Sequence, residues 1–140
     1  MLKQLLLVFT LVSMTDVTMG NAAEAGLVPQ TSNERGVKVT VTPHNFSSPE
    51  KTWDFEVVLE THTQDLNEDM AKSSILIADG KQYAPLGWEG APPGGHHRKG
   101  LLHFMAITPQ PQSVELKIRL TGETAPRSLL WLLKGVGNGK

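Results

Sequence analysis

The chain has 140 residues and no cysteine, and its 13 basic and 14 acidic residues give a formal net charge of −1. A nucleic-acid-binding protein would show an excess of clustered Lys and Arg, so the balanced charge excludes that class of partner. The lack of cysteine excludes disulfides, thiolate metal sites and thiol nucleophiles. The fold must therefore rest on the packing of its hydrophobic residues, which make up 39% of the chain.

Residues 1–25 are typical of a secretory signal peptide. Lys3 precedes an apolar run from Leu5 to Met14, and Ala23-Glu24-Ala25 is typical of a cleavage site. The apolar run has about ten residues, whereas a membrane-spanning helix needs about 20. We therefore expect an exported protein, periplasmic or secreted after cleavage near Ala25, with no membrane span in its mature form.

After the signal, apolar and polar residues alternate with period two, which indicates β-strands. The polar stretch 26–35 is predicted to be a flexible lead-in, the domain to span 36–134, and 135–140 to be a flexible tail. Residues 61–69 are too polar for a core and are predicted to cross between sheets, with a helical turn around 68–72. In chain order, strands are predicted over 37–42, 53–60, 74–78, 81–86, 101–107, 114–120 and 127–133.

About seven short strands at regular spacing, without an amphipathic helix, predict an all-β fold. We expect an immunoglobulin-like two-sheet sandwich, and a small open β-barrel is the alternative. The inter-sheet disulfide of many such sandwiches is impossible here, so Trp53 and Trp131 are expected to fill the space between the sheets.

One segment has a composition that an ordinary strand or turn does not require: Trp88-Glu89-Gly90-Ala91-Pro92-Pro93-Gly94-Gly95-His96-His97-Arg98. The prolines stiffen the backbone, and the two glycines permit a tight turn with positive φ. One interpretation is a ligand-facing loop that presents His96, His97 and Arg98. The other is a connection between sheets, in which Trp88 plugs the core and the His or Arg side chains bind backbone carbonyls.

Five histidines offer a second interpretation of the same region. Imidazole suits copper and zinc, which an exported protein meets outside the cytosol. His96 and His97 can converge in a loop, His62 ends the strand 53–60, and His103 is expected on the outer face of the strand after the loop. A copper or zinc site built from His62, His96, His97 and His103 is therefore the alternative to a cofactor-free domain.

The sequence motifs do not support enzyme activity or calcium binding by an EF-hand. The chain has no Gly-x-Ser-x-Gly, no His-Glu-x-x-His and no phosphate-binding glycine loop, so we expect no enzyme activity. Asp65 to Asp69 begins like a calcium loop, but Met70 and Leu76 replace the required Gly and Glu, which excludes an EF-hand.

The segment 88–98, followed by Gly100-Leu101-Leu102-x-Phe104 and preceded by a stretch from Phe55 to Leu66, resembles uncharacterised exported prokaryotic proteins with an immunoglobulin-like domain. The resemblance covers roughly residues 37–133 and implies no particular activity. We expect a non-enzymatic binding or assembly module of the cell envelope that acts through the loop 88–98 on an unknown protein or small ligand. The expected binding residues are His62, Asp65, Trp88, Glu89, His96, His97 and Arg98.

Overall fold

A computed structural model of the protein describes residues 27–44, 46 and 51–133. The predicted signal peptide at 1–25 and the predicted tail at 135–140 lie outside these residues, so both stay predictions. In the part of the chain that is described, no helix has the length and apolar character needed to cross a membrane.

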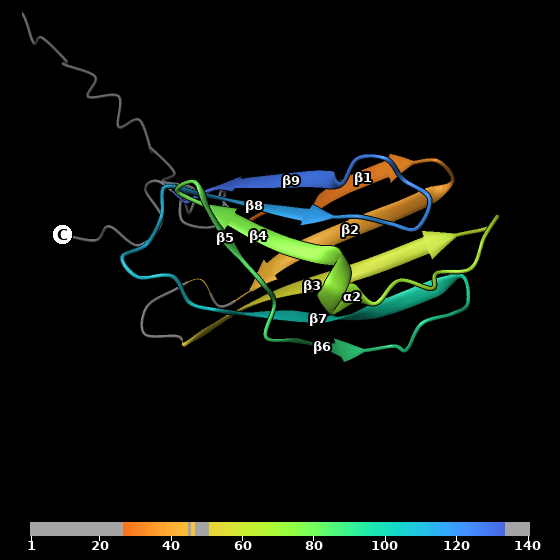
Figure 1. The fold of residues 1–140 in the computed structure, drawn as a ribbon, viewed down its shortest axis with the longest axis horizontal. Coiled ribbons are helices and arrows are strands. Elements are labelled where there is room, and N and C mark those ends of the chain that lie inside the picture. The colour runs from red at the N-terminus through yellow and green to blue at the C-terminus, as the bar shows by residue number, and fades with distance from the viewer. Residues whose placement is uncertain (1–26, 45, 47–50, 134–140) are drawn as a thin grey trace, which may run out of the picture.

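The described residues form two antiparallel β-sheets (Figure 1). The larger sheet has the order β1-β2-β3-β7-β6 and the smaller the order β5-β4-β8-β9. The predicted two-sheet sandwich is confirmed, and the barrel alternative is wrong because no strand pairing joins one sheet to the other. The elements are β1 (Gln30–Glu34), β2 (Val37–His44), β3 (Thr52–Thr61), α2 (Met70–Ser73), β4 (Ser74–Ala78), β5 (Lys81–Tyr83), β6 (Gly87–Gly90), β7 (His97–Met105), β8 (Ser113–Ile118) and β9 (Arg127–Leu132).

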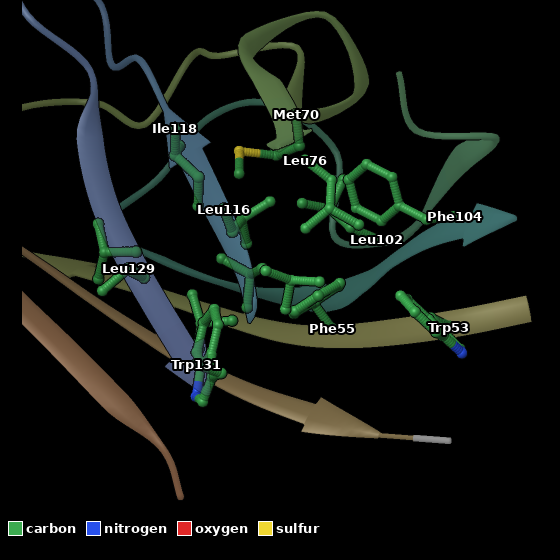
Figure 2. Packing of buried hydrophobic residues seen from close by; sticks show 14 of the residues in the cluster. Trp53, Phe55, Met70, Leu76, Leu102, Phe104, Leu116, Ile118, Leu129 and Trp131 are labelled. Atoms are coloured by element: carbon green, nitrogen blue, oxygen red, sulfur yellow. The ribbon is translucent and has the colours of Figure 1, made fainter. Parts of the chain in front are cut away.

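The period-two pattern explains the core. On β3, alternate residues from Trp53 to Leu59 face the opposite sheet and are at most 3% exposed. The ring of Phe55 lies at the centre, with centroids 5.5 Å from Phe104 on β7 and 5.6 Å from Trp131 on β9 (Figure 2). Trp53 and Trp131 are 3% and 1% exposed, which confirms that they fill the space between the sheets.

Residues 30–34 form the edge strand β1, although the sequence pattern placed them in a flexible lead-in. A tight turn at Arg35 (φ 50°) and Gly36 (φ 78°) folds β1 back onto β2, with which it pairs along its whole length. Arg127, 3% exposed, donates to three carbonyls of β1 and the start of β2 at N···O distances of 2.6–3.2 Å. Backbone pairing and one buried guanidinium order this polar segment, which is why apolar periodicity does not reveal it.

The strands around the segment 88–98 also differ from those predicted. The stretch predicted as one strand over 81–86 ends at Tyr83, and a separate strand, β6, follows at 87–90. β7 begins at His97 rather than at residue 101. Because β6 pairs with β7, the segment 88–98 is a hairpin within the larger sheet and not a connection between sheets.

Three connections lie at the same end of the sandwich (Figure 1). They are the β1–β2 turn at 35–36, the crossover at 62–69 that leads into α2, and the β6–β7 loop at 91–96. The predicted helical turn in the crossover is confirmed as α2, whose N-terminus is capped by the Asp69 carboxylate, 3.2 Å from the Lys72 N–H. This end of the molecule holds most of the predicted site.

Candidate functional site

The tip of the β6–β7 hairpin is fixed by the crossover segment. The Gly94 N–H donates to the Leu66 carbonyl (2.7 Å), and the Leu66 N–H donates to the Gly95 carbonyl (3.0 Å). The Thr61 N–H donates to the His96 carbonyl (3.0 Å). The φ angles of Gly94 and Gly95 are 117° and 74°, so the predicted positive-φ turn is confirmed. The loop is thus hydrogen-bonded to a segment whose Leu66 side chain is buried in the core.

Arg98 supports this arrangement from the interior. Its side chain is on the inward face of β7 and only 2% exposed. The guanidinium donates to the carbonyls of Leu66 (3.3 Å), Glu68 (2.7 Å) and Ala91 (3.1 Å), and so joins the crossover to the hairpin loop. Burial lowers the pKa of Arg98, and the nearby charge of Glu68 acts in the opposite direction. Arg98 therefore binds backbone carbonyls inside the domain and does not stand on the loop surface as predicted.

Trp88 is likewise part of the packing. Its indole Nε1–H donates to the Ala91 carbonyl (3.0 Å), and the Arg98 guanidinium carbon lies 5.7 Å from the ring centroid. A Cβ at Gly100 would be 2.5 Å from Cζ2 of Trp88, so the indole lies against the bare backbone of β7. Trp88 and Arg98 therefore have structural contacts, as the second interpretation of this segment expected for a Trp and an Arg.

Four of the predicted residues form two contact pairs at the surface of this end. The rings of His62 and His97 have centroids 6.4 Å apart and meet edge to face. Nε2 of His96 is 3.9 Å from Oδ1 of Asp65, and their side chains are 51% and 68% exposed. All four residues are exposed, and we call His62, Asp65, His96 and His97 the rim.

A surface pocket of about 450 Å³ adjoins the rim. Its lining includes His62 and His97 as well as two charged residues that the sequence did not single out, Lys38 and Glu60. Glu60 pairs with Lys38 on one side and with His97 on the other, which places all three in one row across the sheet. The rest of the lining consists of Asn33, Gly36, Thr61 and Thr63.

Glu89 and His103 belong to a different place, the outer face of the larger sheet. Nδ1 of His103 is 2.6 Å from Oδ1 of Asp54, and Nε2 is 3.0 Å from Oε2 of Glu89. The hydrogen bond to Asp54 is the main cause that raises the pKa of His103, desolvation opposes it, and the bond to Glu89 adds to it.

The predicted set of four histidine ligands is therefore wrong as a single site. His103 is six positions along β7 from His97, or about 20 Å at the usual rise of a strand. One ion with metal–nitrogen distances of about 2 Å cannot reach both. Within the described residues, no three His, Asp or Glu side chains are arranged to hold a metal ion. The His62 and His97 pair is the part of the set that the fold brings together.

Comparison with known proteins finds no family model that matches the chain and no curated protein that matches its sequence. The resemblance to exported immunoglobulin-like proteins therefore stays a prediction. The function is accordingly argued from the geometry of the rim and its support.

Proposed function

We propose that this chain is an exported, non-enzymatic binding or assembly domain of the cell envelope, and that the rim is its binding surface. The observation that carries the proposal is the hydrogen-bonded attachment of the hairpin loop to the crossover. The attachment supports the proposal because the crossover carries His62 and Asp65 and the hairpin carries His96 and His97, which they contact in two pairs. The two segments come from distant parts of the sequence, so the grouping is a product of the fold.

Preorganisation is what makes such a surface suitable for binding. Ordering a loop and its side chains on association costs free energy, and a loop that is already ordered avoids much of that cost. The three backbone bonds and the Arg98 guanidinium hold residues 91–96 before any partner arrives. The exposed imidazoles and the Asp65 carboxylate remain available to a protein or small ligand.

The pocket beside the rim adds depth to this surface. A volume of about 450 Å³ lies within the usual range for small-molecule sites, which is about 300–1,000 Å³. Lys38, Glu60 and Asn33 offer donors and acceptors in addition to the imidazoles. A partner that inserts a polar side chain or a small polar ligand would use both the rim and this pocket.

Site-specific photo-crosslinking in the native host tests the proposal. A photoreactive residue replaces His96 in one strain and the exposed Gln82 of β5 in a control strain. We expect a discrete crosslinked adduct from position 96 and none of the same mass from position 82. Equal adducts from the two positions, or none from position 96, would contradict the proposal.

A second candidate function, copper or zinc binding, is favoured by the His62 and His97 pair. At metal–nitrogen distances of about 2.1 Å, two imidazoles on one tetrahedral ion have ring centroids about 5 Å apart. The observed separation is 6.4 Å, so side-chain rotation alone would bring the rings into range. The remaining ligands would be water or a partner's side chain, because no third His, Asp or Glu of the described residues joins this pair.

Calorimetric titration with Zn(II) and Cu(II) distinguishes this candidate. Binding at micromolar concentration or tighter that is lost in His62→Ala and His97→Ala supports it, with His44→Ala as the control because His44 is an exposed histidine on β2. Binding that is weaker, or that is unchanged in the two variants, eliminates the metal and leaves the proposal of a protein or small-ligand partner in place.

A further inference from the structure

His103 connects three neighbouring strands of the larger sheet on its outer face. Asp54 is on the central strand β3, His103 on β7, and Glu89 on the edge strand β6. The Asp54 and His103 residues are directly paired, and Gly87 is the residue opposite His103 on β6. The Glu89 carboxylate, which is next along this face of β6, reaches His103 diagonally.

The two hydrogen bonds of His103 depend on one proton. A carboxylate is only an acceptor, and a neutral imidazole has a single N–H to donate. Both contacts, at 2.6 Å and 3.0 Å, are therefore satisfied together only by the imidazolium. The neutral ring must give up one of them. Asp54 is the less exposed carboxylate, at 15% against 78% for Glu89, so Glu89 is the contact that is lost.

The other titratable groups on this face include His44, Glu56 and Lys99, and also Lys38, Glu60 and His97 at the end that carries the rim. His44 is opposite Asp54 on β2, and its Nε2 is 3.9 Å from the Glu56 carboxylate. Nζ of Lys99 is 3.8 Å from the same carboxylate. The side chains of His44 and Lys99 thus both lie near Glu56, and the groups within hydrogen-bonding distance of the His103 ring are the two carboxylates, one on each side.

The strand that carries Glu89 is at the edge of the larger sheet. β6 has four residues, begins and ends with glycine, and pairs with β7 alone. Gly90 leads directly into the loop 91–96, whose first residue, Ala91, accepts hydrogen bonds from Trp88 and Arg98. The contact between Glu89 and His103 therefore adds a side-chain link to the backbone bonds that Leu86 and Ala91 donate to β7.

We propose that His103 is a proton-operated clasp: its imidazolium fixes β6 to the centre of the sheet, and loss of the proton releases Glu89 and loosens β6 at the base of the rim loop. The link to rim binding rests on the proposed function, whereas the clasp itself does not. A partner at the rim would meet a more firmly held loop in acidic surroundings than in alkaline ones.

Amide hydrogen exchange of the purified protein, followed by NMR together with the titration of the His103 ring, tests the clasp. After correction for intrinsic exchange, protection of the amides of Leu86 and Ala91, which donate to the His103 and Lys99 carbonyls at the two ends of β6, should fall about tenfold as His103 deprotonates, as expected for one charge-assisted hydrogen bond. Amides of Leu76 on β4, in the other sheet, should show no such step.

Glu89→Gln is the decisive variant, with Glu115→Gln on the other sheet as its control. Glu89→Gln should lower the titration midpoint of His103 and abolish the step in β6 protection, and Glu115→Gln should do neither. The proposal is overturned if protection of β6 in the unmodified protein does not change across the titration, or if Glu89→Gln leaves the midpoint unchanged. No rim ligand is used, so a failure here is separate from a failure of the proposed function.

Discussion

Arg98 donates a hydrogen bond of 2.7 Å to the backbone carbonyl of Glu68, and this contact joins the inner face of the larger sheet to the crossover that leaves it. Two further bonds from the same guanidinium reach Leu66 and Ala91. A single buried cation therefore holds both segments that form the rim. The hairpin and the crossover should respond together when this side chain is altered.

Replacement of Arg98 by Met should destabilise the domain strongly. The variant removes three hydrogen bonds to backbone carbonyls and the positive charge that interacts with the buried Glu68, and we expect a loss of about 3 kcal/mol in the free energy of unfolding. Urea unfolding followed by tryptophan fluorescence measures it. Arg119→Met, at an exposed arginine, is the control and should change the free energy by less than about 0.5 kcal/mol. Equal effects of the two substitutions would show that Arg98 does not have this structural role.

Gly100 should not accept a side chain. A Cβ there would be 2.5 Å from Trp88 and 2.7 Å from the Glu89 carbonyl oxygen, so the indole or the β6 strand must move. Gly100→Ala should cost about 2 kcal/mol of stability, and it should alter the near-ultraviolet circular dichroism of the tryptophans. Gly87→Ala is the matched control on the same hairpin, because a Cβ at Gly87 meets no atom within 4 Å. If Gly100→Ala has as small an effect as Gly87→Ala, the close contact of Trp88 with β7 is wrong.

The stability of the domain should depend on pH through His103. The pKa of His103 is raised above its ordinary value of 6.5, mainly by the bond to Asp54, so folding favours the protonated ring. The resulting stabilisation is fully present below about pH 6.5, and it is lost as the pH rises through the raised value. The difference in unfolding free energy between the protein and His103→Gln should therefore be larger at about pH 5.5 than at about pH 8.5, by up to about 1 kcal/mol. A larger difference at about pH 8.5 than at about pH 5.5 would contradict the conclusion that folding favours the protonated His103 ring.

Gln30 should protect the exposed edge of β9 from pairing with other chains. The Gln30 side-chain amide donates to the Leu130 carbonyl and accepts from the Leu130 N–H (3.1 Å), so it satisfies the outer edge of that strand. Gln30→Ala exposes this edge beside the exposed side chains of Leu130 and Leu132. We expect concentration-dependent association, since open edges pair with other chains. Sedimentation velocity detects it, and Gln82→Ala on β5 is the control that should remain unchanged. Identical sedimentation of both variants would show that Gln30 does not protect the edge.

The sequence predicted the sandwich because its central strands are encoded by local alternation. Trp53 to Leu59 on β3 and Val37 to Val41 on β2 each place every second side chain in the core. β1 escaped detection because its polar side chains show no apolar alternation, and because Arg127, which helps to order it, is distant in sequence. The short β6 has only the exposed Glu89 and the half-buried Trp88 between two glycines, too few residues to show a period.

The sequence predicted only part of the candidate site, because local patterns reveal some of its residues and strand register decides the rest. The grouping of His62 and Asp65 with His96 and His97 was expected, and the structure brings His62 to His97 and Asp65 to His96. Arg98 was misplaced, although the alternation that places Phe104 and Leu102 inward continues back through Gly100 to Arg98 and was available in the sequence. The pairing of Glu60 with His97, and of Asp54 with His103, depends on the register between β3 and β7, which no local pattern encodes.

The claim that the rim is the binding surface is tested most directly by competition for the adduct formed from position 96 in the native host. Purified protein is added in excess as the unmodified chain, as the triple variant His62→Ala/Asp65→Ala/His97→Ala, or as Glu115→Gln, which changes β8 in the other sheet and leaves the rim side chains intact. We predict that the unmodified chain and Glu115→Gln reduce the yield of the adduct at about pH 6, and that the triple variant does not. Equal competition by the triple variant would contradict the rim as the binding surface.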